Sequence, residues 1–130
     1  MPAGLSSAGV AQLWLGSIQG SGAVASTART SVFGQLHIGD PGSAGTGNPA
    51  ATSTRVAFNF SVSGGTMTIT GGSPVFTATA AETISYISFW TASSSGTFLW
   101  SAQLTVSKVV AVSDTLTFTS AGIALTPLAA

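Results

Sequence analysis

Two apolar runs joined by a Ser/Gly loop constrain the fold of this chain more than any other feature. The runs are Ile84–Trp90 and Phe98–Leu104, and the loop tip between them is Ser93–Gly96. This arrangement is typical of a β-hairpin with a longer loop. Alternation with a period of two makes both faces of the first run apolar, with Ile84, Tyr86 and Trp90 on one face and Ile87 and Phe89 on the other. We therefore expect this hairpin in the middle of a sandwich, or between a sandwich and a neighbouring subunit.

Further strand patterns lie on both sides of this hairpin. Arg55–Val62 alternates as one strand, and a turn at Ser63–Thr66 leads back into Met67–Ile69, which makes this the clearest hairpin of the sequence. The other expected strands are Val32–Ile38, Val75–Thr79, Thr105–Val112, Thr115–Thr119 and Gly122–Thr126. Short strands at regular spacing with turn residues between them predict an all-β fold, either an antiparallel β-sandwich or a jelly roll.

The first thirty residues follow a different pattern, which divides the chain into a segment 1–30 and a β-sandwich domain 31–130. Val10, Leu13, Trp14 and Ile18 recur every three or four residues, which allows one short helix, although several glycines weaken it. Either this segment is an arm or strand that covers its own sandwich, or it docks on a neighbouring subunit. A signal peptide is not expected, because no Lys or Arg precedes the apolar stretch.

The charge content is very low for a chain of this size. Only 5% of the 130 residues are charged, with three basic and three acidic residues, whereas about 25% is usual. Such a surface fits a protein that is packed in an assembly or forms an inert coat. Nucleic-acid binding is disfavoured because it needs clustered Lys and Arg. No apolar run approaches the length of a membrane span, and the absence of cysteine excludes disulfides and thiolate metal sites.

Candidate catalytic residues are scarce. His37 is the single histidine, with Asp40 three residues on, but on a strand the two would point to opposite faces, and no Gly-x-Ser-x-Gly motif is present. One histidine and three carboxylates offer no metal-ligand spacing. We therefore predict no catalytic, cofactor-binding or metal site. The residues His37, Asp40, Pro41, Gly42 and Arg55 are instead assigned to a structural turn, in which Arg55 either pairs with Asp40 or is a solvated strand end.

The aromatic residues suggest contact surfaces. Three tryptophans could stack on sugar rings, but the amides that would bind the hydroxyls are scattered, so packing in a core or an interface is favoured. The predicted interface residues are Leu13, Trp14, Tyr86, Phe89, Trp90 and Trp100.

A series of short motifs resembles a known family. In chain order they are Leu36–Gly42 (LHIGDPG), Arg55–Phe58 (RVAF), Ser63–Gly65 (SGG), Ile87–Trp90 (ISFW), Gly96–Leu99 (GTFL), Leu104–Lys108 (LTVSK) and Ser113–Thr115 (SDT). They resemble a family of small β-sandwich structural proteins of tailed bacteriophages, best represented among phages of actinobacteria, which carry similar LHxxDPG and ALTxSK…GDT segments. Two features depart from that pattern: the loop after Gly42 lacks an acidic residue, and Lys108 is followed by an unusually apolar Val109–Val112.

The resemblance implies a virion protein without enzymatic activity, made in the host cytoplasm. Because the sequence predicts one minimal domain without an added receptor-binding segment, we expect a capsid decoration protein that cements the head shell. The alternative is a minor tail or tail-fibre protein whose loops, Gly39–Ser53 and Ser93–Gly96, contact the host surface, with glycans as candidate ligands. The expected partners are other virion proteins (the major capsid protein or tail proteins) and further copies in a homotrimer or higher multimer, with neither nucleic acid nor membrane.

Overall fold

The computed structural model of the chain describes residues 31–63 and 66–124. Within these residues every strand pairing is antiparallel and no helix occurs. The strands are β1 (Val32–His37), β2 (Val56–Phe58), β3 (Phe60–Ser63), β4 (Thr66–Ile69), β5 (Val75–Thr77), β6 (Glu82–Trp90), β7 (Phe98–Val110), β8 (Thr115–Thr117) and β9 (Gly122–Ala124). The predicted all-β antiparallel fold is confirmed, while the expected N-terminal arm or helix lies outside the described residues.

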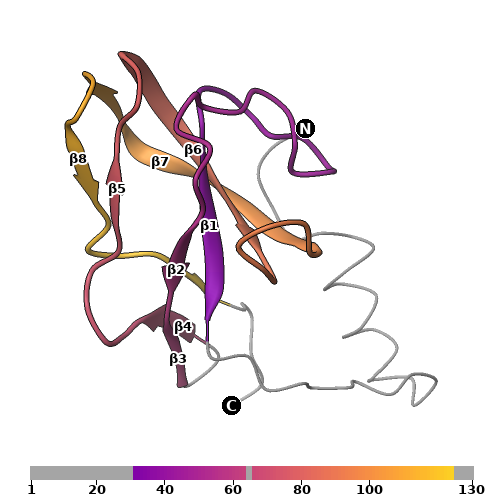
Figure 1. Ribbon diagram of the computed structural model, residues 1–130. Helices are drawn as coiled ribbons and strands as arrows, with labels where there is room; N and C mark the ends of the chain where they lie inside the picture. The colour runs from indigo at the N-terminus through magenta and orange to yellow at the C-terminus, as the bar shows by residue number, and fades with distance from the viewer. Residues whose placement is uncertain (1–30, 64–65, 125–130) are drawn as a thin grey trace.

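The strands form three sheets (Figure 1). The largest has the order β2-β1-β6-β7, and the smaller ones are β3-β4-β9 and β5-β8. The predicted central hairpin is β6–β7, in which Phe89 pairs with Trp100. β6 lies between β1 and β7, so both of its edges are paired. Side chains are buried on both of its faces, Phe89 on one and Ser88 and Trp90 on the other, as its apolar pattern predicts.

The two smaller sheets pack on one face of the large sheet through an aromatic core. Phe58 of β2 is fully buried, and its ring centroid lies 5.1 Å from that of Phe89 and 6.2 Å from that of Phe76 in β5. Phe89 also stacks on Trp100 at 4.3 Å. Gly34 of β1 gives Phe58 its space, because a Cβ there would lie 2.6 Å from the Phe58 ring.

The expected strand Arg55–Val62 is in fact two strands in different sheets. It divides at Asn59, where the chain leaves its pairing with β1 and begins its pairing with β4. Asn59 holds this corner, because its carbonyl accepts from Thr70 N at 2.8 Å and its side chain accepts from Ser31 Oγ at 2.7 Å. The hairpin after the corner is confirmed, with Phe60 opposite Ile69.

The expected break between Leu104 and Thr105 is also wrong, because β7 runs without interruption from Phe98 to Val110. Its partner β6 pairs Tyr86 with Gln103 and Ile84 with Lys108, so residues 104–107 of β7 lie opposite Ser85 alone. This bulge, with four residues opposite one, lies where the sequence suggests a break between two strands.

Candidate functional site

The outer face of the large sheet, away from the aromatic core, carries a buried polar network. Gln35 pairs with Ser88 and His37 with Tyr86 in the β1–β6 ladder, so these four side chains share a face. His37 and Ser88 are fully buried. His37 Nδ1 lies 2.8 Å from the Gly47 carbonyl oxygen, and His37 Nε2 lies 2.7 Å from Ser88 Oγ.

The partners of this network fix its protons. The Gly47 carbonyl can only accept, so Nδ1 of the neutral ring carries the proton and Nε2 accepts from the Ser88 hydroxyl. Trp90 Nε1 in turn donates to Ser88 Oγ at 2.8 Å. Burial lowers the pKa of His37 below its ordinary value of 6.5, and the charge of Arg55 acts in the same direction, whereas the backbone contacts with Gly47 and Asn48 oppose the shift. The neutral ring is therefore the form that this site stabilises.

The His37–Ser88 pair has a structural role, because it links β1 and β6 to the loop at Gly47. It is not arranged for attack on a substrate. Both residues are fully buried, so a substrate carbonyl cannot reach the hydroxyl. The position that an acid takes in a catalytic triad is filled by the Gly47 carbonyl. Asp40 Oδ1 accepts from Gly42 N at 2.8 Å, which is the geometry of a local Asx turn.

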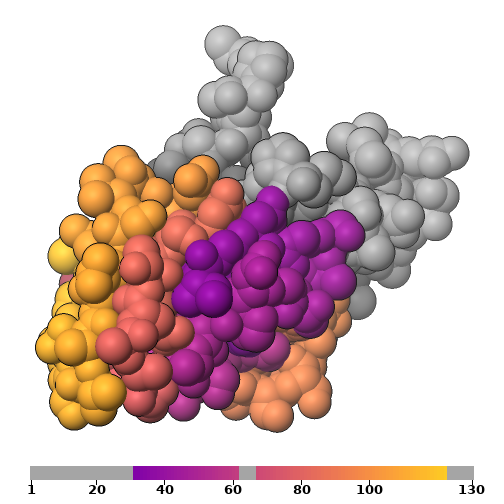
Figure 2. Space-filling model, turned by 90° about the horizontal axis from the view of Figure 1, so that it is seen from above, coloured from indigo at the N-terminus to yellow at the C-terminus, as the bar shows by residue number. Residues whose placement is uncertain are grey.

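The segment 39–50 covers the outer face next to this network. Gly47 N donates to the carbonyl of the buried Pro41 at 2.8 Å, and Gly45 lies so close to the Phe98 ring that a Cβ would collide with it. Gly45 also has a φ of 74°, which favours glycine. Figure 2 shows this segment in purple beside the salmon residues of the β5–β6 region.

The chain just after this segment is fixed to the start of β6. The Glu82 carboxylate accepts from Ala51 N at 2.8 Å and from Thr52 N at 3.2 Å. The later part of the covering loop is therefore held at two points, at Gly47 by His37 and at Ala51 and Thr52 by Glu82.

Arg55 fixes a second loop, residues 91–97, which joins β6 to β7. Its Nη1 donates to the carbonyls of Ala92 at 3.0 Å and Ser95 at 2.6 Å, and its Nε donates to Gln35 Oε1 at 2.9 Å. Its Cζ lies 4.0 Å from the centre of the Trp90 ring, a cation–π distance. The guanidinium is thus a clasp for this loop and not a solvated strand end. The predicted pairing of Arg55 with Asp40 stays a prediction.

The residues predicted as an interface lie in different environments. Phe89 and Trp100 belong to the core, and Tyr86 is half-buried on the outer face. Trp90 and Trp100 are 7% and 6% exposed, and Trp90 is capped by Arg55, so neither offers a ring face to a sugar. Leu13 and Trp14 lie outside the described residues. The subunit-interface role of these six residues stays a prediction.

Sequence reasoning missed an exposed apolar patch at the end of β7. Val106, Val109 and Val112 are 63%, 82% and 62% exposed. Among the described residues no strand pairs with the free edge of β7, which bounds the large sheet. The signal was present in the sequence as the apolar run Val109–Val112, one of the two departures from the phage family pattern. We call Val106, Val109 and Val112 the valine patch.

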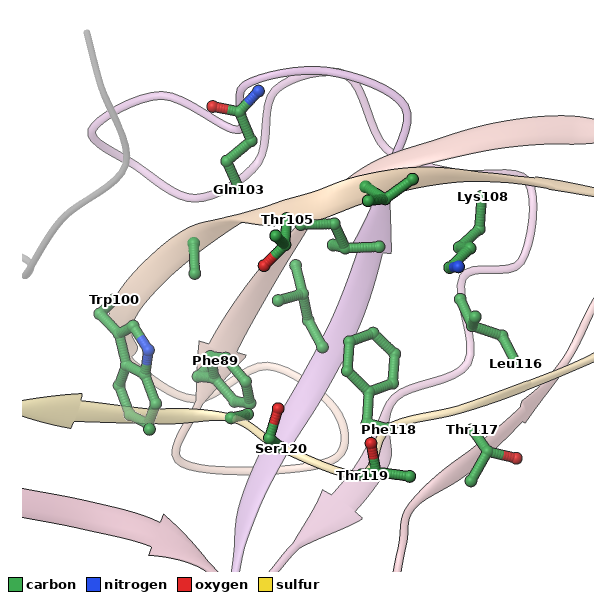
Figure 3. A pocket seen from close by; sticks show the side chains of 16 residues that line it. Phe89, Trp100, Gln103, Thr105, Lys108, Leu116, Thr117, Phe118, Thr119 and Ser120 are labelled. Atoms are coloured by element: carbon green, nitrogen blue, oxygen red, sulfur yellow. The ribbon is translucent and has the colours of Figure 1, made fainter.

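A groove of about 450 Å³ lies beside this edge, between β6–β7 and residues 116–122. Figure 3 shows the rings of Phe89, Trp100 and Phe118 around it. In the described part of the chain no group of three or more His, Asp or Glu could hold a metal ion. No helix there is long and apolar enough to cross a membrane.

A small antiparallel β-domain whose buried polar groups fasten loops belongs to the class of structural or binding modules. Residues 10–126 match the protein family described as podophage GP4 fiber I protein gp80, and the chain belongs to this family of phage fibre proteins. No curated protein matches the chain.

The family makes the chain a structural component of a virion, as the sequence predicts. It supports the fibre alternative better than the preferred role in capsid decoration. The narrower kinship with proteins of actinobacterial phages stays a prediction.

Proposed function

We propose that this chain is a non-enzymatic building block of a tail fibre, which associates with further copies and with other tail or fibre proteins through the free edge of β7 and the valine patch. The observation that carries this proposal is a long strand that bounds its sheet and ends in exposed apolar side chains. The predicted homotrimer is one assembly of this kind.

An exposed strand edge is usually protected against pairing. Charged side chains and bulges are the common devices, and β7 has both in Lys108 and the bulge at 104–107. Beyond Lys108, however, Val109 and Val112 leave the end of the strand apolar and exposed. Each Å² of apolar area removed from water contributes about 25 cal/mol, so repeated contacts of this kind would stabilise a fibre.

Charge substitutions in the valine patch test this proposal. Val109→Glu with Val112→Glu should reduce both the multimeric fraction in sedimentation velocity and incorporation into particles, because a charge would be buried in the contact. Folding should persist, since both side chains are exposed. Val75→Glu is the matched control, as an exposed valine on β5. Equal assembly of the patch variant and the control would refute the role of the patch.

A second candidate function is contact with the host surface through loops 39–53 and 91–97. The supporting observation is that both loops are fastened by directional bonds, from His37 and Glu82 in one case and from Arg55 in the other. Such preorganisation lowers the entropic cost of binding. Ser93→Asp with Ser94→Asp, at the exposed tip, should slow phage adsorption without changing the melting temperature. Unchanged adsorption would place the host contact elsewhere.

A further inference from the structure

The groove beside β7 is a gap between the two layers of the domain. Ile87, Phe89 and Trp100 line it from the large sheet, and Leu116 and Phe118 line it from the opposite side (Figure 3). The groove is open at the surface, where exposed residues such as Thr105, Lys108 and Ser120 form its rim, whereas protein interiors are packed without gaps of this size. Aromatic and aliphatic side chains that border such a gap lose the dispersion contacts that a filled core would provide.

The size and chemistry of the groove indicate what fits. At about 450 Å³ it is roughly three times the cavity of about 150 Å³ that accepts a benzene molecule in an apolar core. It therefore has room for about three large apolar side chains. The polar residues around it are mostly hydroxyl-bearing, such as Thr105, Thr119 and Ser120. Their hydroxyl oxygens can accept a hydrogen bond from an indole N–H. Lys108 is the one charged lining residue.

The chain carries an apolar stretch that meets this description. Val10–Ile18 contains Val10, Leu13, Trp14, Leu15 and Ile18 and no charged residue. The family match begins at Val10, so the stretch belongs to the unit that the family shares. It lies outside the described residues.

The reach of the chain allows this stretch to meet its own groove. Phe33, two residues after Ser31, pairs with Trp90, and the adjacent Phe89 pairs with Trp100 at the groove. Two strand spacings, about 10 Å, separate β1 from β7 at this level. Residues 19–30 can span up to about 40 Å when extended. The connection is thus several times longer than the strand separation requires.

We infer that Val10–Ile18 docks in the groove of its own chain, between β7 and residues 116–122, and completes the core of the domain. Of the two alternatives for the N-terminal segment, this is the covering arm. The inference does not depend on the fibre role, because it concerns the closure of a single copy. Val106 lines the groove, whereas Val109 and Val112 do not and remain available for assembly.

Disulfide trapping tests this inference directly, because the chain has no cysteine. Ser17→Cys retains all apolar residues of the stretch, and Ser120→Cys places a thiol in the groove with almost no change in size. Under mild oxidation of dilute protein, we expect most molecules to form an intramolecular disulfide, seen as a faster-migrating monomer on a non-reducing gel. A ladder of linked copies, or no cross-link, would overturn docking in the same chain.

The matched control is Ser17→Cys with Ala57→Cys. Ala57 is exposed on β2, at the opposite edge of the large sheet, and it pairs with Phe33 close to Ser31. A segment that sampled the surface at random would reach Ala57 as readily as the groove. We expect little cross-linking in this control, and cross-linking as efficient as with Ser120→Cys would also overturn the inference.

A second measurement does not require a cross-link. Leu13→Ser with Trp14→Ser should expose the groove and increase the fluorescence of a hydrophobic dye several-fold, with a lower melting temperature. Dye binding and melting temperature equal to those of the unchanged protein would contradict docking.

Discussion

The two faces of the four-stranded sheet are built on the same strands but by different physics. On the inner face, Phe58, Phe89 and Trp100 pack through apolar burial, which requires size and shape but little direction. On the outer face, His37, Ser88 and Arg55 act through hydrogen bonds of defined geometry. The comparison indicates that the inner face provides most of the stability, whereas the outer face sets the positions of two loops.

The largest effect should come from the inner face. Phe89→Ala removes a fully buried ring that stacks on Trp100 and meets Phe58 edge-on. We expect a loss of about 3–5 kcal/mol in the free energy of unfolding, from lost transfer energy and a residual cavity. Urea denaturation measures it. A loss below 1 kcal/mol would show that this face does not carry the stability.

On the outer face, His37→Leu should have a smaller effect. It leaves the Gly47 carbonyl and the Ser88 hydroxyl without their present partner, at a cost of about 1–3 kcal/mol. Relative to the unchanged protein, this variant should exchange its backbone amide hydrogens faster at residues 39–50, while the exchange rates in β6 change little. Uniform acceleration over the whole domain would contradict a specific role in holding the loop.

The same histidine predicts the direction of a pH effect. In the folded state the pKa of His37 lies below 6.5, mainly because the ring is buried. As the pH falls, His37 is therefore protonated in the unfolded chain before it is protonated in the folded one. His37 therefore contributes its full stabilisation above pH 6.5, and this contribution declines from about there down to the folded pKa. Since the chain has one histidine, thermal melts between pH 5.5 and 7.5 should report this site. His37→Gln should flatten the curve, and an unchanged slope would exclude His37 as its source.

The smallest effect on stability is expected at the clasp. Arg55→Lys keeps the charge but loses the forked donor geometry that reaches Gln35, Ala92 and Ser95. Because the site is partly exposed, we expect a loss of about 1 kcal/mol or less. Limited proteolysis should nevertheless be faster at residues 91–97. Cleavage rates equal to those of the unchanged protein would mean that the loop is fixed by other contacts.

The inner face was largely predictable from the sequence. Alternation alone assigns Phe58 to the interior and Ala57 and Asn59 to solvent, and the structure agrees. The division at Asn59 was not predictable, because alternation continues through the corner while only the pairing partner changes. The bulge in β7 was missed for a similar reason, since it depends on the register with β6.

The outer face was only partly predictable. Gly39–Gly42 predicts a turn next to His37, and Asp40 and Gly42 do form a local contact there. The other partners are distant in sequence: Ser88 lies 51 residues from His37, and Ser95 lies 40 residues from Arg55. No local pattern encodes such pairs. The head or fibre location likewise depends on contacts between proteins, and a single chain carries only an indirect signal of them.

Imaging this chain on its own virion tests the central claim, that it is a fibre component, most directly. An antibody fragment bound to the exposed tip Ser93–Ser95 would mark each copy in cryo-electron tomograms of intact particles. We predict label along fibres attached to the tail, in clusters that reflect several copies per fibre. Label spread over the head shell would contradict the account and restore the role in capsid decoration.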